Sequence, residues 1–122
     1  MLNEKFYEVI SKEGVVSITS WSGDNTHVVN TWNSYLVTEG DKILIPAAGM
    51  RKTEKNIEKN NKVILTLGSK EVMGYRSMGT GFVVEGIAKY VYSGEKFDMM
   101  KEKFPFLSRV LEITVSSALQ TL

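Results

Sequence analysis

At 122 residues, 43% of them apolar and 24% charged, the chain has the size and composition of one globular domain, which excludes a fibrous or disordered protein. Fifteen Lys and Arg against 14 Asp and Glu leave a net charge of +1, so we expect no nucleic-acid partner. There is no cysteine, which excludes disulfides, thiolate catalysis and CxxC redox chemistry, so any redox role requires a bound cofactor.

The N-terminal segment carries charged residues among its apolar ones and therefore lacks the apolar core of a signal peptide. No apolar stretch approaches the roughly 20 residues that a membrane span needs. We therefore expect a cytoplasmic protein without a membrane partner, with residues 1–122 forming a single domain.

Three short helices are predicted in chain order. Asn3 caps the first, which places Phe6 and Val9 on one face and has Gly14 just past its end. The second covers residues 53–61. Ser93 caps the third, which ends at Pro105.

The pattern of apolar and β-branched residues predicts the strands. They are expected at 15–20, 27–38, 42–45 (stopped by Pro46), 62–68, 72–76, 81–92 and 110–115, with a bulge or bend at Gly86. Many are neighbours in sequence, which favours a barrel over a doubly wound sheet. We therefore predict a mainly β fold, a six-stranded antiparallel split β-barrel with a few short helices.

The segment 27–36 is the first candidate for a site, because its centre is polar on both faces of the expected strand. Asn30, Thr31, Asn33 and Ser34 provide the polar groups. From the residues alone, an edge strand or a bend is the slightly better interpretation.

The second candidate is a run of small residues that leads into two cations and a helix start. It comprises Pro46, Ala47, Ala48, Gly49, Met50, Arg51, Lys52, Thr53 and Glu54. Small side chains allow backbone N–H groups to approach a ligand, Thr53 is placed where an N-cap is expected, and the helix dipole adds to the lysine and arginine charges. A phosphate site is one interpretation, and a solvated basic turn is about equally supported.

Other features are weaker. Gly79-Thr80-Gly81 lacks the third glycine and the following helix of a dinucleotide fingerprint. His27 is the only histidine, which excludes a histidine-rich metal site and a Ser-His-Asp triad with a spare base. The aromatic residues Trp32, Tyr35 and Phe106 are candidates for a flat-ligand platform, although such residues more often pack in a core.

Taken together, several segments resemble the small FMN-binding members of the split-barrel flavoproteins related to pyridoxamine 5′-phosphate oxidase. They are Gly14-Val15-Val16, VNTWNSY at 29–35, GMRKTE at 49–54, LTLGS at 65–69, GTGF at 79–82, ITV at 113–115 and QTL at 120–122. The resemblance implies FMN bound without covalent attachment, in a groove at the interface of a homodimer.

The resemblance also implies roles for particular residues. Lys52 and Thr53 match the phosphate positions; Asn30, Thr31, Trp32 and Asn33 match the strand beside the ring and ribityl chain; and Ala47, Ala48, Gly49 and Met50 match the loop over the cofactor. Tyr35 is expected near the ring and Arg51 at the phosphate end. Phe106 and Leu122 are expected to reach the partner's flavin, with residues 118–122 packing across the dimer.

The implied function is a small electron carrier or oxidoreductase whose chemistry belongs to the flavin, with a redox partner that the sequence does not identify. A storage or sensing module without turnover is the alternative. Haem or a deazaflavin could replace FMN on the same fold, although the phosphate-type site favours FMN. The chain lacks the extra segments with which the larger oxidases hold pyridoxine phosphate, which disfavours vitamin B6 oxidation.

Overall fold

The computed structural model describes all 122 residues and contains one seven-stranded sheet in which every neighbouring pair of strands is antiparallel. Its elements are α1 (Glu4–Ile10), β1 (Val15–Ser22), β2 (Asn25–Trp32), the 3₁₀ turn η1 (Asn33–Tyr35), β3 (Val37–Glu39), β4 (Lys42–Ala47), α2 (Arg51–Lys59), β5 (Lys62–Met73), β6 (Met78–Val91), α3 (Glu95–Lys103) and β7 (Arg109–Gln120). The predicted mainly β class is confirmed, with seven strands where six were expected.

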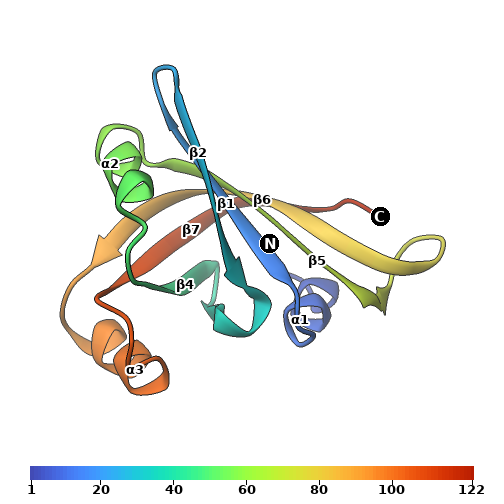
Figure 1. Cartoon of the computed structure of the whole chain (residues 1–122). Coiled ribbons are helices and arrows are strands. Elements are labelled where there is room, and N and C mark those ends of the chain that lie inside the picture. The colour runs from blue at the N-terminus through green and yellow to red at the C-terminus, as the bar shows by residue number, and fades with distance from the viewer.

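The strand order is β2-β1-β5-β6-β7-β4-β3, so the two edges of the sheet are β2 and β3. These edges follow each other in the chain and are joined by η1, yet they share no ladder of hydrogen bonds. The curled sheet therefore stays open along this line. α2 lies beside the β1–β2 hairpin, α3 lies where β6 ends and β7 begins, and α1 lies at the opposite side of the sheet, before the start of β1 (Figure 1).

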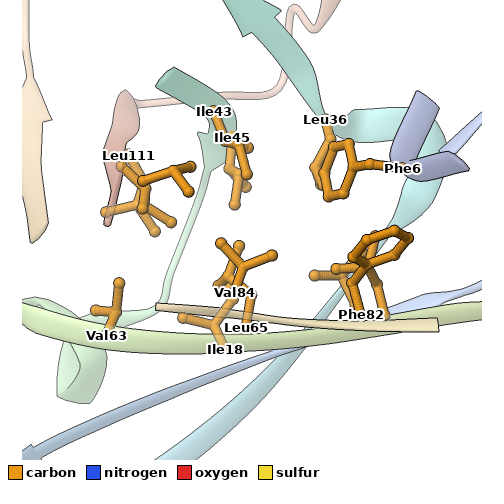
Figure 2. Close-up of a cluster of buried hydrophobic side chains, with 14 of the residues drawn as sticks. Phe6, Ile18, Leu36, Ile43, Ile45, Val63, Leu65, Phe82, Val84 and Leu111 are labelled. Atoms are coloured by element: carbon orange, nitrogen blue, oxygen red, sulfur yellow. The ribbon is translucent and has the colours of Figure 1, made fainter. Parts of the chain in front are cut away.

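The main core fills the inside of the curled sheet. Alternate residues of β5 are buried, as the two-residue period of a strand dictates when only one face is covered. Figure 2 shows side chains of β1, β5 and β6 facing those of β4, β7 and Leu36. Phe6 of α1 closes one end of the core and meets Phe82 edge to face, with ring centroids 5.5 Å apart.

The strand predicted at 27–38 is wrong, because the chain breaks at η1. Asn33 turns its side chain into the protein, where Nδ2 donates to the backbone oxygens of Val9, Lys12 and Gly68 at 3.3, 3.0 and 3.1 Å. One amide thus contacts two neighbouring carbonyls at the end of α1 and a third, from Gly68, that lies far away in the sequence, and these contacts fix the bend.

Three other boundaries differ from the prediction. Residues 72–76 are not a strand of their own, because Val72 belongs to β5 and residues 74–77 turn into β6. Pro46 does not stop β4, which continues to Ala47; beyond Leu44 this strand pairs only with β7, so it has an open side that tolerates proline. Ser93 does not cap α3, which follows Gly94 at φ 101° without a side-chain cap.

The bulge predicted at Gly86 is confirmed by a register shift between Glu85 and Gly86. A Cβ at this position would come within 2.6 Å of the Thr114 carbonyl oxygen, so the close approach of β6 and β7 requires glycine. Beyond the bulge, β7 continues to Gln120, which pairs with Phe82, and only two residues lie past the strand.

α3 is held against β7 by Glu112, whose side chain is buried. Lys96 of α3 donates to this carboxylate, and Lys89 and Lys42 lie 3.5 and 3.8 Å from it. Burial alone would raise the pKa of Glu112, but the Lys96 hydrogen bond and the lysine charges outweigh it and lower the pKa. Lys96 is the second residue of α3, so this contact holds the N-terminal end of the helix, and the C-terminal end leads to the aromatic segment 104–106.

Candidate functional site

A hollow of about 250 Å³ opens where β2 runs into η1, against the end of β4 and the residues that follow α3. Its lining comprises Val29, Asn30, Thr31, Trp32, Tyr35, Pro46, Ala48, Met50 and Phe106. The structure thus brings together residues from both candidate segments of the sequence, which lie about 15 positions apart, with the distant Phe106. No Asp, Glu, His, Lys or Arg lines this hollow.

Aromatic side chains form one wall of the hollow. Tyr35 packs against Phe104 and Phe106, with ring centroids 5.3 and 5.5 Å apart. Trp32 belongs to no aromatic pair and is 46% exposed, and Phe106 is 51% exposed. Large apolar rings left this open at the mouth of a hollow are a surface on which a flat ligand can stack.

The loop before α2 adopts an uncommon backbone. Gly49 and Met50 both have positive φ, 68° and 53°, and Met50 is the N-cap of α2 without a side-chain hydrogen bond to the helix. The first N–H groups of a helix have no partner within the helix, so the N-terminus of α2 offers donors together with the positive end of its dipole.

Thr53 is not the N-cap that the sequence predicts. It is the third residue of α2 and is completely buried, and its hydroxyl oxygen Oγ1 has no hydrogen-bond partner. An unsatisfied buried hydroxyl is costly and uncommon. This orphaned group in the first turn of α2 fits an anionic ligand that the helix N-terminus also favours.

Arg109, at the start of β7, holds this loop in place through hydrogen bonds of its buried guanidinium. The guanidinium is 2% exposed; Nη2 donates to the Gly49 carbonyl oxygen at 2.7 Å, Nε donates to Glu54 Oε2 at 3.0 Å and Nη1 donates to Ser108 Oγ at 2.9 Å. Its Cζ lies 5.0 Å from the centroid of the Tyr90 ring. One buried cation therefore ties β7 to both the left-handed loop and α2.

Glu54 is the carboxylate at the centre of this network. It also accepts a hydrogen bond from the Tyr92 hydroxyl at 2.8 Å. Burial by itself would raise the pKa of Glu54, but hydrogen bonds from Tyr92 and Arg109 and the charge of Arg109 together lower the pKa. Burial also raises the pKa of Tyr90 to about 12, so this phenol stays neutral beside the guanidinium.

The other residues expected in the site lie outside the hollow. Asn33 is committed to the backbone contacts described above, and Ala47 is buried in β4. Arg51 is exposed and pairs with Glu54 at 3.3 Å, while Lys52 lines a neighbouring hollow. Leu122 lies beside Tyr75 and Arg76 at the β5–β6 turn, away from this hollow.

Sequence reasoning missed Arg109 and Tyr92, and it placed Glu54 in the second candidate segment without a role in holding the loop. The available signal was Arg109 itself, a cation directly before the strand predicted at 110–115, where an unpaired buried charge would be very unfavourable. Its partner was not visible, because Glu54 lies 55 positions earlier. No three His, Cys, Asp or Glu side chains lie close enough to hold a metal ion, and no helix of the chain is long and apolar enough to cross a membrane.

Residues 2–121 match a family model described as Pyridoxamine 5′-phosphate oxidase. The chain belongs to this family. A relative from Nitratidesulfovibrio vulgaris (strain DSM 19637 / Miyazaki F), named FMN-binding protein, is 45% identical over 123 residues, and the match covers the whole of both chains.

Solved structures carry the pyridoxamine 5′-phosphate oxidase fold at much lower identity. A variant of HupZ from Group A Streptococcus matches 99% of this chain and 100% of its own, with a TM-score of 0.79 and 12% identity. An FMN-binding protein from Syntrophomonas wolfei subsp. wolfei matches 88% of this chain and 76% of its own, with a TM-score of 0.68 and 19% identity. At these identities the likeness concerns the fold alone.

The two arginines that contact Glu54 allow a matched comparison within this family member. We expect Arg109→Met to lower the free energy of unfolding by about 3–5 kcal/mol, because it leaves a partly buried carboxylate without its main partner. Arg51, which is 69% exposed, should matter little: Arg51→Gln should cost less than about 1 kcal/mol. Urea unfolding of both variants measures this, and equal losses would contradict the assigned role of Arg109.

Proposed function

We propose that the chain binds FMN without a covalent bond, with the phosphate at the N-terminus of α2 and the ring in the aromatic hollow. The observation that carries this proposal is the buried, unpartnered hydroxyl of Thr53 in the first turn of α2, a few residues from a hollow with exposed aromatic rings. The name and 45% identity of the Nitratidesulfovibrio relative support FMN as the ligand.

At the phosphate end, the chain supplies donors of three kinds. The Thr53 hydroxyl has no hydrogen-bond partner in the protein and is therefore free to donate to the phosphate. The first N–H groups of α2 point out of the helix end, and exposed Lys52 adds a mobile charge. Arg109 does not touch the ligand. It holds the Gly49 carbonyl away from the phosphate and keeps the loop in the shape that leaves the helix end open.

At the ring end, the chain supplies position and exclusion of water. Trp32 provides an open face for stacking, and Asn30 and Thr31 provide neutral polar groups. The bound flavin supplies one- and two-electron chemistry. Because no charged side chain lines the hollow, the chain lacks a positioned acid or base for a specific substrate, which favours an electron carrier over a substrate-specific oxidase.

We also infer that the working form is a homodimer. The hollow is shallow, and Trp32 and Phe106 remain about half exposed, so one chain covers only part of a tricyclic ring. Val15, Leu119 and Leu122 form exposed apolar surface elsewhere on the chain, which a second copy would cover. Leu122 of the second copy would then be available to the open side of the ring.

The oligomeric state can be measured directly. A stable contact should bury at least about 1,000 Å² in total, so light scattering at micromolar concentration should give twice the chain mass. Leu119→Glu should shift the population toward the monomer, because it places a charge in the buried contact. A wild-type protein that is monomeric at these concentrations would contradict the dimer.

The phosphate assignment predicts a preference for FMN over riboflavin. Two charge-assisted hydrogen bonds, from Lys52 and Thr53, give a preference on the order of a hundredfold to ten-thousandfold. Thr53→Val keeps the shape of the side chain but removes the hydroxyl. It should lower the affinity for FMN by about tenfold or more and leave the affinity for riboflavin unchanged. The unliganded variant should be at least as stable as the wild type. Calorimetric titration with both flavins tests this, and parallel changes in the two affinities would place the phosphate elsewhere.

The ring assignment predicts strong quenching of flavin fluorescence by neighbouring electron-rich aromatics. Trp32→Ala and Tyr35→Ala should each raise the fluorescence of bound FMN. The increase should be larger for Trp32→Ala, because the face of the Trp32 ring is open to the ligand. If neither variant changes the fluorescence, the ring lies elsewhere. The same preparations, screened with amines, pyridoxine phosphates and nicotinamide dinucleotides, should show no rapid turnover, and rapid turnover of one small substrate would contradict the carrier.

A further inference from the structure

A second hollow, of about 360 Å³, lies between other residues of the same two parts of the chain. The first hollow uses Val29 to Trp32 of β2 and the loop up to Met50. The second uses Asn25 to His27 of β2 and the helix from Lys52 onward. Lys52, which the proposed FMN site uses for the phosphate, lines the second hollow, so the two proposed sites share the N-terminal end of α2.

The lining of this second hollow, here called the lysine groove, contains no hydrophobic residue and no carboxylate. Lys52, Lys55 and Lys59 lie along it at spacings of three and four, which places them on one face of α2. None of the three makes an ion pair. A chain of net charge +1 thus concentrates three unpaired positive charges in one groove.

The floor of the lysine groove is held by side chains that bridge its two walls. Asn56 of α2 is 8% exposed, and its Nδ2 donates to Ser20 Oγ and to the Asn25 carbonyl oxygen, both at 3.3 Å. One turn later, Asn60 Nδ2 donates to the Trp21 carbonyl oxygen at 3.0 Å. The helix and the hairpin are therefore fixed relative to each other, and the groove is part of the fold.

We propose that the lysine groove is a second phosphate subsite that takes the adenosyl phosphate half of FAD. This inference rests on the proposed FMN site, because that site places the first phosphate at the mouth of the groove. Lys55 lies one helical turn, about 4.5 Å, beyond Lys52, within reach of a second phosphate joined to the first. His27 and the aliphatic stems of the lysines provide surface for the nucleoside.

The experiment compares riboflavin, FMN and FAD by calorimetric titration. Wild-type protein should bind FAD at least as tightly as FMN. Lys59→Gln, at the far end of the groove, should lower the affinity for FAD by about two- to fivefold, as expected for loss of an exposed charge. The affinity for FMN should stay within about twofold of the wild-type value. The double variant Lys55→Gln/Lys59→Gln should reduce FAD affinity by about tenfold. Lys70→Gln, an exposed lysine of β5 outside the groove, is the matched control and should change neither affinity.

Competition with AMP shows whether the second phosphate is recognised as part of a dinucleotide or as a free nucleotide. AMP at millimolar concentration should compete with FAD and leave the affinity for FMN unchanged. Binding of AMP beside FMN, with FAD more than tenfold weaker than FMN, would overturn the dinucleotide assignment. So would equal effects of Lys59→Gln on FMN and FAD, which would indicate only a general attraction for anions. If neither FMN nor FAD binds, the proposed function itself fails.

Discussion

The buried contact between Arg109 and Glu54 is the constraint on which the candidate site depends. The left-handed pair Gly49 and Met50 is an uncommon conformation, and the start of α2 has no side-chain cap, so neither would be well ordered by local preferences alone. Arg109 supplies the missing order by binding the Gly49 carbonyl and the Glu54 carboxylate together. The contact joins the strand that closes the core to the loop and helix that form the proposed anion-binding end.

A second constraint is the opening between the two edge strands. A fully closed barrel would have paired β2 with β3, whereas the inward turn of Asn33 separates them. The side chains just before and after this turn, Trp32 and Tyr35, are thereby placed at an open edge together with Phe106. The polar amide thus stabilises the bend from inside, and the aromatic residues around it remain available to a ligand. Structural and binding roles are divided between adjacent positions of one segment.

Much of the fold follows from local pattern. Two-residue alternation predicts the central strands, and Asn3 caps α1 as its sequence predicts, accepting a hydrogen bond from the Phe6 amide at 2.9 Å. The errors fall where a contact distant in sequence decides the outcome. Asn33 breaks a strand because carbonyls from the end of α1 and from β5 lie within its reach, and Pro46 stays in β4 because the strand has no second neighbour there. The two candidate segments of the site were visible in the sequence, but the role of Arg109 was not. That role exists only when the fold brings the start of β7 next to Glu54 and the Gly49 carbonyl.

The crystal structure of the protein with bound FMN tests the central claim most directly, because it shows which atom accepts the hydrogen bond of the Thr53 hydroxyl. We predict a phosphate oxygen about 2.5–3.0 Å from Thr53 Oγ1 at the N-terminus of α2, with the Arg109 contacts unchanged and the ring against Trp32. A phosphate bound elsewhere, with Thr53 Oγ1 still buried and unpaired, would contradict the assignment of this helix end and of the loop that Arg109 holds.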